Sequence, residues 1–281
     1  MKIFFIGIVS RALRLFGKIR WVRLGIRYRI ILPLRYIDHE FVVPFFGYKY
    51  QGNLNDYIDR YVFYFGAYEI EELHLLKKYL NKDSVVIDVG ANTGHHALFF
   101  SRYAGEVYAF DPYKDVFDVM KKRIAYNNIK NIQPFNFGIG DKDQFLDFFA
   151  PQGNNKGTGS FVLPDSKNNI GKLEIKNGDN FIQSLGLTRI DLIKIDVEEM
   201  EEAVISGLRG TIDKFRPILF IEVTPEAQKN IMANLGSICA DYDFYTVDAN
   251  NPKLIIFNKP GCKLAKFKPS DCIVNILCLP K

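Results

Sequence analysis

Residues 85–111 read VVIDVGANTGHHALFFSRYAGEVYAFD, and this stretch decides the fold of the chain. An apolar run passes into Asp88, the chain turns through Gly90 and Gly94 into a helical segment, and a second apolar run ends at Asp111. This order of strand, glycine-rich turn, helix and strand predicts a βαβ unit, whose first turn binds a nucleotide-like ligand in doubly wound α/β folds. Glycine allows the turn to be tight, and the helix N-terminus presents N–H groups to the ligand.

The turn lacks the signatures of the common phosphate-binding loops. Asn92 and His95 stand where a dinucleotide fingerprint has its second and third glycines, and Gly94 is not followed by the lysine of a P-loop. Asp88 would repel a pyrophosphate but suits an ammonium group. Asp111, about 20 residues further on, is placed to accept hydrogen bonds from two ribose hydroxyls. A ribose and an ammonium group without phosphate describe S-adenosylmethionine; a purely structural βαβ turn is the alternative.

The predicted cofactor site draws on three turns that follow three strands. The third of these strands is expected at residues 132–137, and an adenine ring would lie in the turn after it. The candidate cofactor-binding residues are Asp88, Gly90, Ala91, Asn92 and Gly94 in the first turn, Asp111 and Pro112 in the second, and Gly138, Ile139 and Asp141 in the third.

The charge of the chain is unevenly distributed. Its 281 residues, 48% of them hydrophobic, allow one large domain or a domain with an appendage. The net charge is +5, but residues 1–36 carry nine Lys and Arg and no Asp or Glu, which leaves 28 basic against 32 acidic residues in the remainder. An enzyme that grips long nucleic acid more often spreads basic residues around its cleft, so a nucleic-acid substrate is disfavoured.

The four cysteines all lie between Cys239 and Cys278 and have no C-x-x-C spacing. This arrangement favours packing roles in a reducing compartment over a zinc site or a disulfide framework. We therefore expect a cytoplasmic protein.

The apolar run of the basic leader is too short to cross a bilayer, because a membrane-spanning helix needs roughly 20 apolar residues. The leader also does not resemble a signal peptide, because Arg11 and Arg14 interrupt its apolar run and no A-x-A cleavage site follows. One face of a helix here would be apolar and the other basic, which fits either peripheral contact with an anionic membrane surface or docking on the enzyme's own core. The apolar face would consist of Ile6, Val9, Leu13 and Phe16.

We expect two parts, a basic N-terminal extension and cap at residues 1–65 and a cofactor-binding domain at residues 66–281. Residues 28–65 are rich in aromatic and β-branched side chains, which predicts short strands or a hairpin. A glycine-rich stretch, residues 153–160, is either a connector or a loop that closes over substrate. Further helices are expected at 69–80, 113–127, 198–208 and 227–235, and further strands at 145–149, 190–197, 217–223, 242–247, 253–257 and 271–279.

Four ordered motifs over about residues 66–225 resemble those of the FkbM-type methyltransferases. They are D-V-G-A-N-T-G at 88–94, A-F-D-P at 109–112, I-D-L-I-K-I-D-V-E at 190–198 and I-E-V at 221–223. The resemblance implies a class I methyltransferase fold, a Rossmann-like, doubly wound, mostly parallel seven-stranded sheet whose last strand is antiparallel. It also implies S-adenosylmethionine as donor and, most commonly, O-methylation of a sugar or polyketide hydroxyl.

The chain departs from the family pattern at two positions. Asp111 replaces the more usual Glu, which should still serve the ribose. Glu199 replaces the Gly of the family's E-G-A-E motif, which affects the acceptor side and leaves the cofactor side intact.

Methyl transfer to a sugar hydroxyl requires a base, or a metal ion that makes the hydroxyl more acidic. Ligands in open α/β sheets bind beyond the carboxyl ends of the strands, where Asp196, Glu198 and Glu222 are expected. We predict Asp196 or Glu198 as the base and Glu222 as a carboxylate that positions substrate. Carboxylates in this number also suit Mg²⁺, to which we assign no ligands. Lys194 alternates with Asp196 and could face the same side, although a snorkelling lysine is the commoner arrangement.

Two other functions stay open. The basic leader, with Lys194 and Asp196, would fit an RNA methyltransferase, although the acidic body and the absence of an N-P-P-Y-type tetrapeptide argue against it. The second alternative is a non-catalytic, membrane-associated binding module that keeps the cofactor-binding fold. The favoured partner is a small-molecule or glycan acceptor.

Overall fold

The computed structural model describes residues 38–151, 159–161, 168–223, 236, 238–239, 241–248, 262–267 and 275–281. The leader helix, the helix expected at 227–235, the strand expected at 253–257 and most of the glycine-rich stretch lie outside these residues. Among the helices of the described ranges, none combines the length and apolar character needed to cross a bilayer.

The chain forms two compact units, which divide after Leu76. In the first unit, β1 (Glu40–Phe45) and β2 (Tyr48–Asn53) form the expected hairpin. Its two-residue turn, Phe46 and Gly47, has positive φ at both positions, as a type I′ turn requires.

Two helices follow the hairpin: α3 (Tyr57–Phe65) and α4 (Ile70–Leu76). Helix α3 was not anticipated, because its aromatic composition favours strands. Its ends explain it: the Asp56 side chain accepts a hydrogen bond from the Asp59 amide, and Gly66 ends the helix at φ 98°.

The second unit, Lys77–Asp248 with Lys263–Lys281, is built on an eight-stranded sheet in the order β12-β11-β13-β10-β9-β3-β4-β5. Strands β5, β4, β3, β9 and β10 pair in parallel, and β13 is antiparallel to both of its neighbours. The doubly wound α/β class and the antiparallel last strand are therefore confirmed. Within the described residues the sheet has eight strands rather than the expected seven, because β12 pairs along the outer edge of β11. The strands are β3 (Val85–Val89), β4 (Glu106–Phe110), β5 (Ile132–Phe135), β9 (Leu192–Ile195), β10 (Ile218–Glu222), β11 (Tyr242–Asp248), β12 (Lys263–Lys266) and β13 (Asn275–Pro280).

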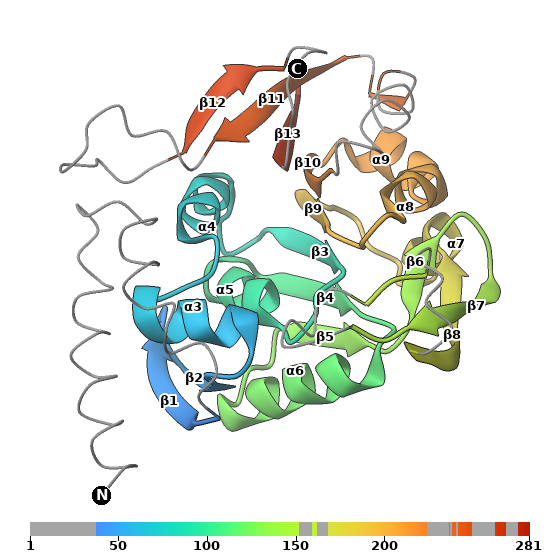
Figure 1. Ribbon diagram of the computed structural model, residues 1–281. Coiled ribbons are helices and arrows are strands. Elements are labelled where there is room, and N and C mark those ends of the chain that lie inside the picture. The colour runs from blue at the N-terminus through green and yellow to red at the C-terminus, as the bar shows by residue number, and fades with distance from the viewer. Residues whose placement is uncertain are drawn as a thin grey trace, which may run out of the picture. The chain divides into compact units, whose positions relative to one another are not determined.

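The chain reverses its direction of travel across the sheet between β3 and β9. From β3 it moves outward through β4 and β5, and it then returns to place β9 against the other side of β3 (Figure 1). Ligands of open α/β sheets bind at such a switch point, beyond the carboxyl ends of the strands. Gly90 follows β3 and Asp196 follows β9, so both lie at this point.

Different helices pack on the two faces of the sheet. Ile87 and Ile193 belong to the main hydrophobic core, together with Ile182, Val204 and Ile212 of α7 (Gly178–Ser184), α8 (Glu201–Gly207) and α9 (Arg209–Phe215). Because side chains alternate along a strand, Asp88, Lys194 and Asp196 point to the opposite face. Helix α5 (His95–Tyr103) packs against β3 and β4 on that face, and α6 (Lys114–Tyr126) packs against β5. A 3-10 turn, η2 (Lys77–Tyr79), precedes β3.

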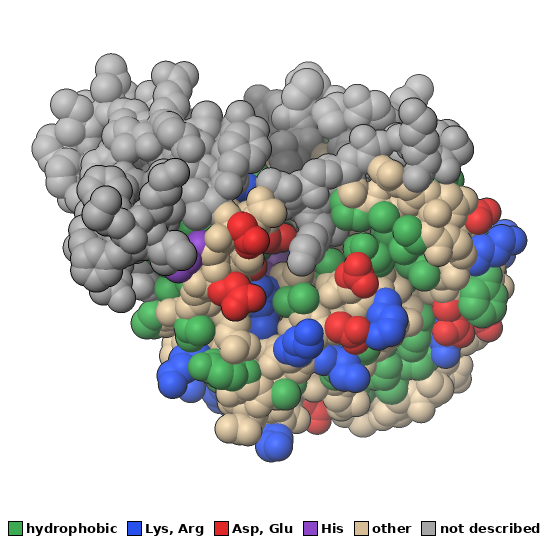
Figure 2. Space-filling view, turned by 60° about the horizontal axis from the view of Figure 1, so that its bottom comes forward, with side chains coloured by type: hydrophobic (Ala, Val, Ile, Leu, Met, Phe, Trp, Pro, Cys, Tyr) green, Lys and Arg blue, Asp and Glu red, His purple; other side chains and the backbone are tan. Residues whose placement is uncertain are grey.

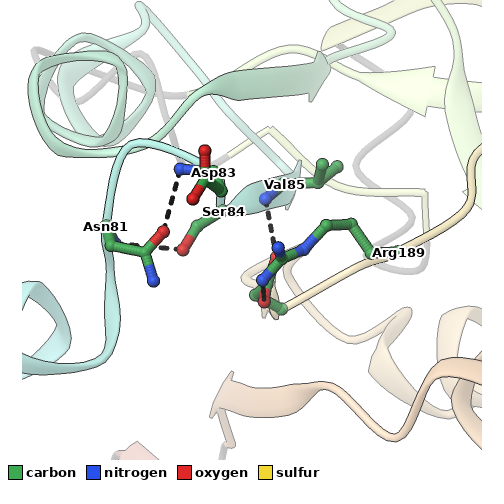
Figure 3. Close-up of polar contacts among 6 residues, drawn as sticks. Asn81, Asp83, Ser84, Val85 and Arg189 are labelled. Atoms are coloured by element: carbon green, nitrogen blue, oxygen red, sulfur yellow. Dashed lines mark hydrogen bonds and ion pairs between the residues drawn. The ribbon is translucent and has the colours of Figure 1, made fainter.

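A polar cluster fixes the amino ends of β3 and β9. Asp191 accepts hydrogen bonds from the Val85 amide at 2.8 Å and from Arg189 Nε at 3.0 Å. Ser84 Oγ accepts from the Asn81 amide at 3.0 Å just before β3 begins (Figure 3). The Val85–Asp191 bond joins the two strands at the end opposite to the switch point, and the other two bonds order the segments that lead into them.

A second, three-stranded sheet has the order β6-β8-β7. Only β7 (Gln144–Phe149) was expected; β6 (Gly138–Gly140) is too short to give a pattern, and β8 (Asn169–Asn177) is mostly exposed and polar. Helix α8 packs directly on β6, because a Cβ at Gly207 would lie 1.9 Å from the Gly140 carbonyl oxygen. This close approach sets the position of Gly138 and Ile139.

Gly207→Ala should lower the free energy of unfolding by about 1–3 kcal/mol, because the added methyl group forces α8 away from β6. Chemical denaturation measures this change. Gly236→Ala is the matched control, since Gly236 is exposed and a Cβ there meets no described residue within 4 Å. Equal stability of the two variants would contradict the close packing.

Candidate functional site

A cleft opens at the switch point of the second unit. Its empty space is about 680 Å³, counting the part open to solvent, which is in the range of small-molecule sites. Among the described residues that line it are three carboxylates and no Lys, Arg or His. The lining residues are Val89, Gly90, Asn92, Phe110, Asp111, Pro112, Tyr113, Val116, Gly138, Ile139, Phe148, Gly159, Phe161, Ile175, Asp196, Val197, Glu198 and Met200.

The turn between β3 and α5 forms one wall of the cleft. Gly90 has φ 78°, and a Cβ there would lie 1.7 Å from the Asp196 carbonyl oxygen. No other residue fits this position, because the backbone of the turn touches the end of β9. Gly94 has φ 81°, and a Cβ there would lie 2.7 Å from Met120 Cγ of α6. The turn is therefore fixed from both sides.

Asp111 stands at the end of β4 and ties two turns together. Its Oδ2 accepts from the Asn92 amide at 2.8 Å and its Oδ1 accepts from the Tyr113 amide at 2.9 Å. Burial raises the pKa of Asp111 to about 7, although these two hydrogen bonds oppose the rise. Each carboxylate oxygen has a second lone pair with which it can accept a further hydrogen bond.

Six of the ten candidate cofactor-binding residues line the cleft: Gly90, Asn92, Asp111, Pro112, Gly138 and Ile139. Ala91 and Gly94 shape the first turn from behind, and Asp141 is exposed, with its carbonyl accepting from Asn177 Nδ2 at 2.7 Å. Asp88 is wholly buried rather than at the mouth of the turn. Contact of all ten residues with a ligand stays a prediction.

An apolar wall completes the cleft, and the sequence did not reveal it. The Phe148 ring lies 5.3 Å from the Tyr113 ring and 5.0 Å from the Phe161 ring, measured between centroids. Val116 and Ile175 line the same space. Strand alternation was the available signal, since it places Phe148 on the opposite side of the predicted strand from Phe145 and Asp147, which are exposed.

The three candidate catalytic carboxylates are brought close together. Asp196 and Glu198 line the cleft, and Glu222, the last residue of β10, hydrogen-bonds to Asp196. Burial, together with the charges of Asp196 and of nearby glutamates, raises the pKa of Glu198 to about 7. For Asp196, burial favours the protonated form, but the charge and hydrogen bond of Lys194, together with Glu222 and His96, outweigh burial and lower the pKa.

Lys194 is buried, with 2% of its side chain exposed, so the snorkelling interpretation is wrong. Its Nζ donates to Asp196 Oδ2 at 2.9 Å and lies 3.7 Å from Asp88 Oδ1. The ammonium group beside Asp88 is thus supplied by the chain itself.

His95 and His96 open α5 and are both buried, with ring centroids 4.9 Å apart. Burial lowers the pKa of His95 well below its usual value, which makes it neutral near pH 7. Neither histidine lines the cleft, in agreement with a packing role.

The described residues contain no group of three or more His, Cys, Asp or Glu arranged to hold a metal ion.

The backbone is strained between β9 and α8. Glu198 has φ 46° and Glu199 has φ 73°, two consecutive left-handed positions at residues other than glycine. Glu199 stands where the family motif has glycine, so a conformation that glycine adopts freely carries a side chain here. Ser160 Oγ donates a hydrogen bond to the Glu198 carbonyl at 3.4 Å, and Ser160 also forms an antiparallel bridge with Phe149. The strained segment is therefore connected to the end of β7.

Comparison with known proteins gives one family. The model of the methyltransferase FkbM domain matches residues 88–244, more than half of the chain. The hexuronic acid methyltransferase AglP of Haloferax volcanii is 28% identical over 153 residues, which are 51% of this chain and 58% of that protein. The 2-O-methyltransferase NoeI of Sinorhizobium fredii is 27% identical over 152 residues, 48% of this chain and 61% of that protein.

The match spans about 60% of the length of AglP, of NoeI and of a third curated relative, methyltransferase 1 of Beauveria bassiana. Among solved structures, the methyltransferase FkbM of Methylobacillus flagellatus aligns with 70% of this chain and 44% of its own, at 16% identity and a TM-score of 0.46.

Glu199→Gly should raise the free energy of unfolding by about 1 kcal/mol, because glycine adopts the left-handed conformation without steric cost. The bond that the residue 199 amide donates to Glu201 Oε1 does not depend on the side chain. Denaturant unfolding is the measurement. Glu202→Gly, inside the first turn of α8, is the matched control and should instead destabilise by about 1 kcal/mol. Destabilisation by both substitutions would contradict the strain.

Proposed function

The chain belongs to the FkbM family of methyltransferases, and from this premise we propose that it transfers a methyl group from S-adenosylmethionine to a hydroxyl of a sugar or glycan. The observation that carries the proposal is the charge of the cleft. Three carboxylates and no cationic side chain among its described lining residues suit a ligand that is positively charged and free of phosphate.

The residues of the cleft fit this donor. Asp111 has lone pairs for the ribose hydroxyls, and its hydrogen bonds with Asn92 and Tyr113 hold it in place. The apolar wall of Val116, Phe148 and Ile175 suits a flat heterocycle. When bound, the donor supplies a methyl group on a positively charged sulfur, and the carboxylates favour that charge in a partly buried site.

The task of the chain is then to orient the acceptor hydroxyl and to accept its proton. Asp196 is the favoured candidate for the base, because it lines the cleft and Lys194 Nζ, 2.9 Å away, holds its carboxylate in one orientation. Glu198 lines the same cleft, but with a pKa of about 7 it is partly protonated near neutral pH. Glu222 hydrogen-bonds to Asp196 and would orient it.

The nature of the acceptor rests on relatives. AglP is named for a hexuronic acid and NoeI for 2-O-methylation, and both names describe a hydroxyl-bearing substrate compatible with a carboxylate base. Nucleic acid is the competing acceptor. On the face drawn in Figure 2, acidic and basic side chains are interspersed, which does not favour binding of a polyanion.

Asp196→Asn should lower turnover by roughly 10²–10⁴-fold, because the amide cannot accept the proton, while donor affinity changes little. Transfer of radiolabel from S-adenosylmethionine to a panel of nucleotide sugars, with UDP-glucuronic acid first, measures turnover, and calorimetry measures donor affinity.

Glu198→Gln tests the other carboxylate and should cost less than Asp196→Asn. Asp213→Asn is the control, since Asp213 lies exposed on α9, and it should retain the wild-type rate. A wild-type rate for Asp196→Asn would remove it as the base. Transfer to RNA in place of sugars would overturn the acceptor class.

A further inference from the structure

A row of four ionisable side chains crosses three neighbouring strands on the face that α5 covers. Asp88 of β3 is paired in register with Lys194 of β9. Asp196 follows two residues later along the same line, and Glu222 ends β10, the strand on the other side of β9. Strand alternation places all four on one face.

We propose that Lys194 is a positioning residue of the methyl transfer: it holds Asp196 ionised and oriented for the acceptor hydroxyl, and Asp88 is the counter-charge that keeps Lys194 in place. This inference rests on the proposed function, in which Asp196 is the base. It assigns Asp88 to the lysine and not to the donor.

The burial of the three charged groups differs along the row. Asp88 is 0% exposed and Lys194 is 2% exposed, whereas 32% of the Asp196 side chain is exposed. A lysine loses its hydration when buried and stays charged only beside compensating groups. Of these three groups, therefore, only Asp196 reaches the cleft, and the buried Asp88 and Lys194 lie behind it.

The distances divide the roles of the two carboxylates. Lys194 donates a hydrogen bond to Asp196 at 2.9 Å, but its distance of 3.7 Å from Asp88 is that of an ion pair and exceeds a hydrogen bond. Neither carboxylate oxygen of Asp88 has a hydrogen-bond partner among the described residues. Burial raises the pKa of Asp88, and the ammonium group of Lys194 opposes that rise, so the contact between the two is electrostatic. Asp196 is the group whose orientation the lysine fixes.

Other titratable groups act on the same site. Lys194 is the basic group whose attraction most favours ionised Asp196, and the Glu222 hydrogen bond and the His96 charge act in the same direction. The acidic neighbours oppose it by repulsion. Among the described residues, the other titratable groups that act on Asp196 or on Lys194 are Asp88, His95, His96, Asp111, Glu198, Glu201 and Glu222.

Lys194→Met tests the proposal. Loss of an opposite charge at this distance should raise the pKa of Asp196 by roughly 1–3 units. Carboxyl ¹³C NMR on the full chain saturated with S-adenosylhomocysteine measures it, with the Asp196 signal assigned from its absence in Asp196→Asn. The acidic limb of the kcat/KM profile, measured with UDP-glucuronic acid or whichever acceptor is turned over, should move to higher pH by the same amount. A merely structural lysine would leave both unchanged, and that result would overturn the proposal.

The paired variant Asp88→Asn/Lys194→Met removes both inner charges and guards against misfolding of the single variant. It should also raise the pKa of Asp196, by less than Lys194→Met does, because the repulsion from Asp88 is gone. Lys82→Met removes an exposed lysine at the amino end of β3 and should change neither readout.

Asp88→Asn separates the two roles of Asp88. If Asp88 serves Lys194, affinity for S-adenosylhomocysteine should change by less than about threefold. A loss of roughly 10–100-fold would mean that Asp88 binds the ligand, and would overturn its assignment to the lysine.

The proposed function can fail separately. A wild-type rate for Asp196→Asn would refute the base, and the positioning role with it, even if the NMR shift is found. A slow Asp196→Asn with unshifted Asp196 titration in Lys194→Met would refute the positioning role alone.

Discussion

The contact between the ends of β3 and β9 is the constraint on which the site depends. Parallel pairing in register brings the turn after β3 so close to the Asp196 carbonyl that only glycine fits at position 90. The turn that would hold the donor and the carboxylate that would act on the acceptor are therefore parts of one rigid junction. A shift of either strand would displace both, which explains why the amino ends of the strands are fixed by the Asp191 hydrogen bonds.

Crowded carboxylates give this junction its electrostatic character. Burial raises the pKa of Asp111 and of Glu198 to about 7, whereas Lys194 lowers the pKa of Asp196. The buried ammonium group of Lys194 thus favours the ionised form of Asp196 over that of the other two carboxylates. A cationic ligand would relieve the repulsion among the others, and a phosphate would increase it.

The sequence predicted the parts of the site that depend on backbone geometry. Gly90 and Gly94 marked the turn, and the acids that end apolar runs marked the carboxyl edge of the sheet. It could not predict contacts set by tertiary packing: the burial of Lys194, the aromatic wall around Phe148, or β8, whose exposed polar residues carry no periodic signal. Helix α3 was missed because its aromatic residues resemble a strand, and the eighth strand because β12 is only four residues long.

Calorimetric titration of S-adenosylhomocysteine and of NAD⁺ into the wild-type chain and Asp111→Ala tests most directly whether the cleft is built for a phosphate-free nucleoside. We expect the wild-type chain to bind S-adenosylhomocysteine and to give no signal with NAD⁺. Loss of the Asp111 hydrogen bonds should weaken binding of S-adenosylhomocysteine roughly 10–100-fold. Binding of NAD⁺ by the wild-type chain, or undiminished affinity of Asp111→Ala for S-adenosylhomocysteine, would contradict the account.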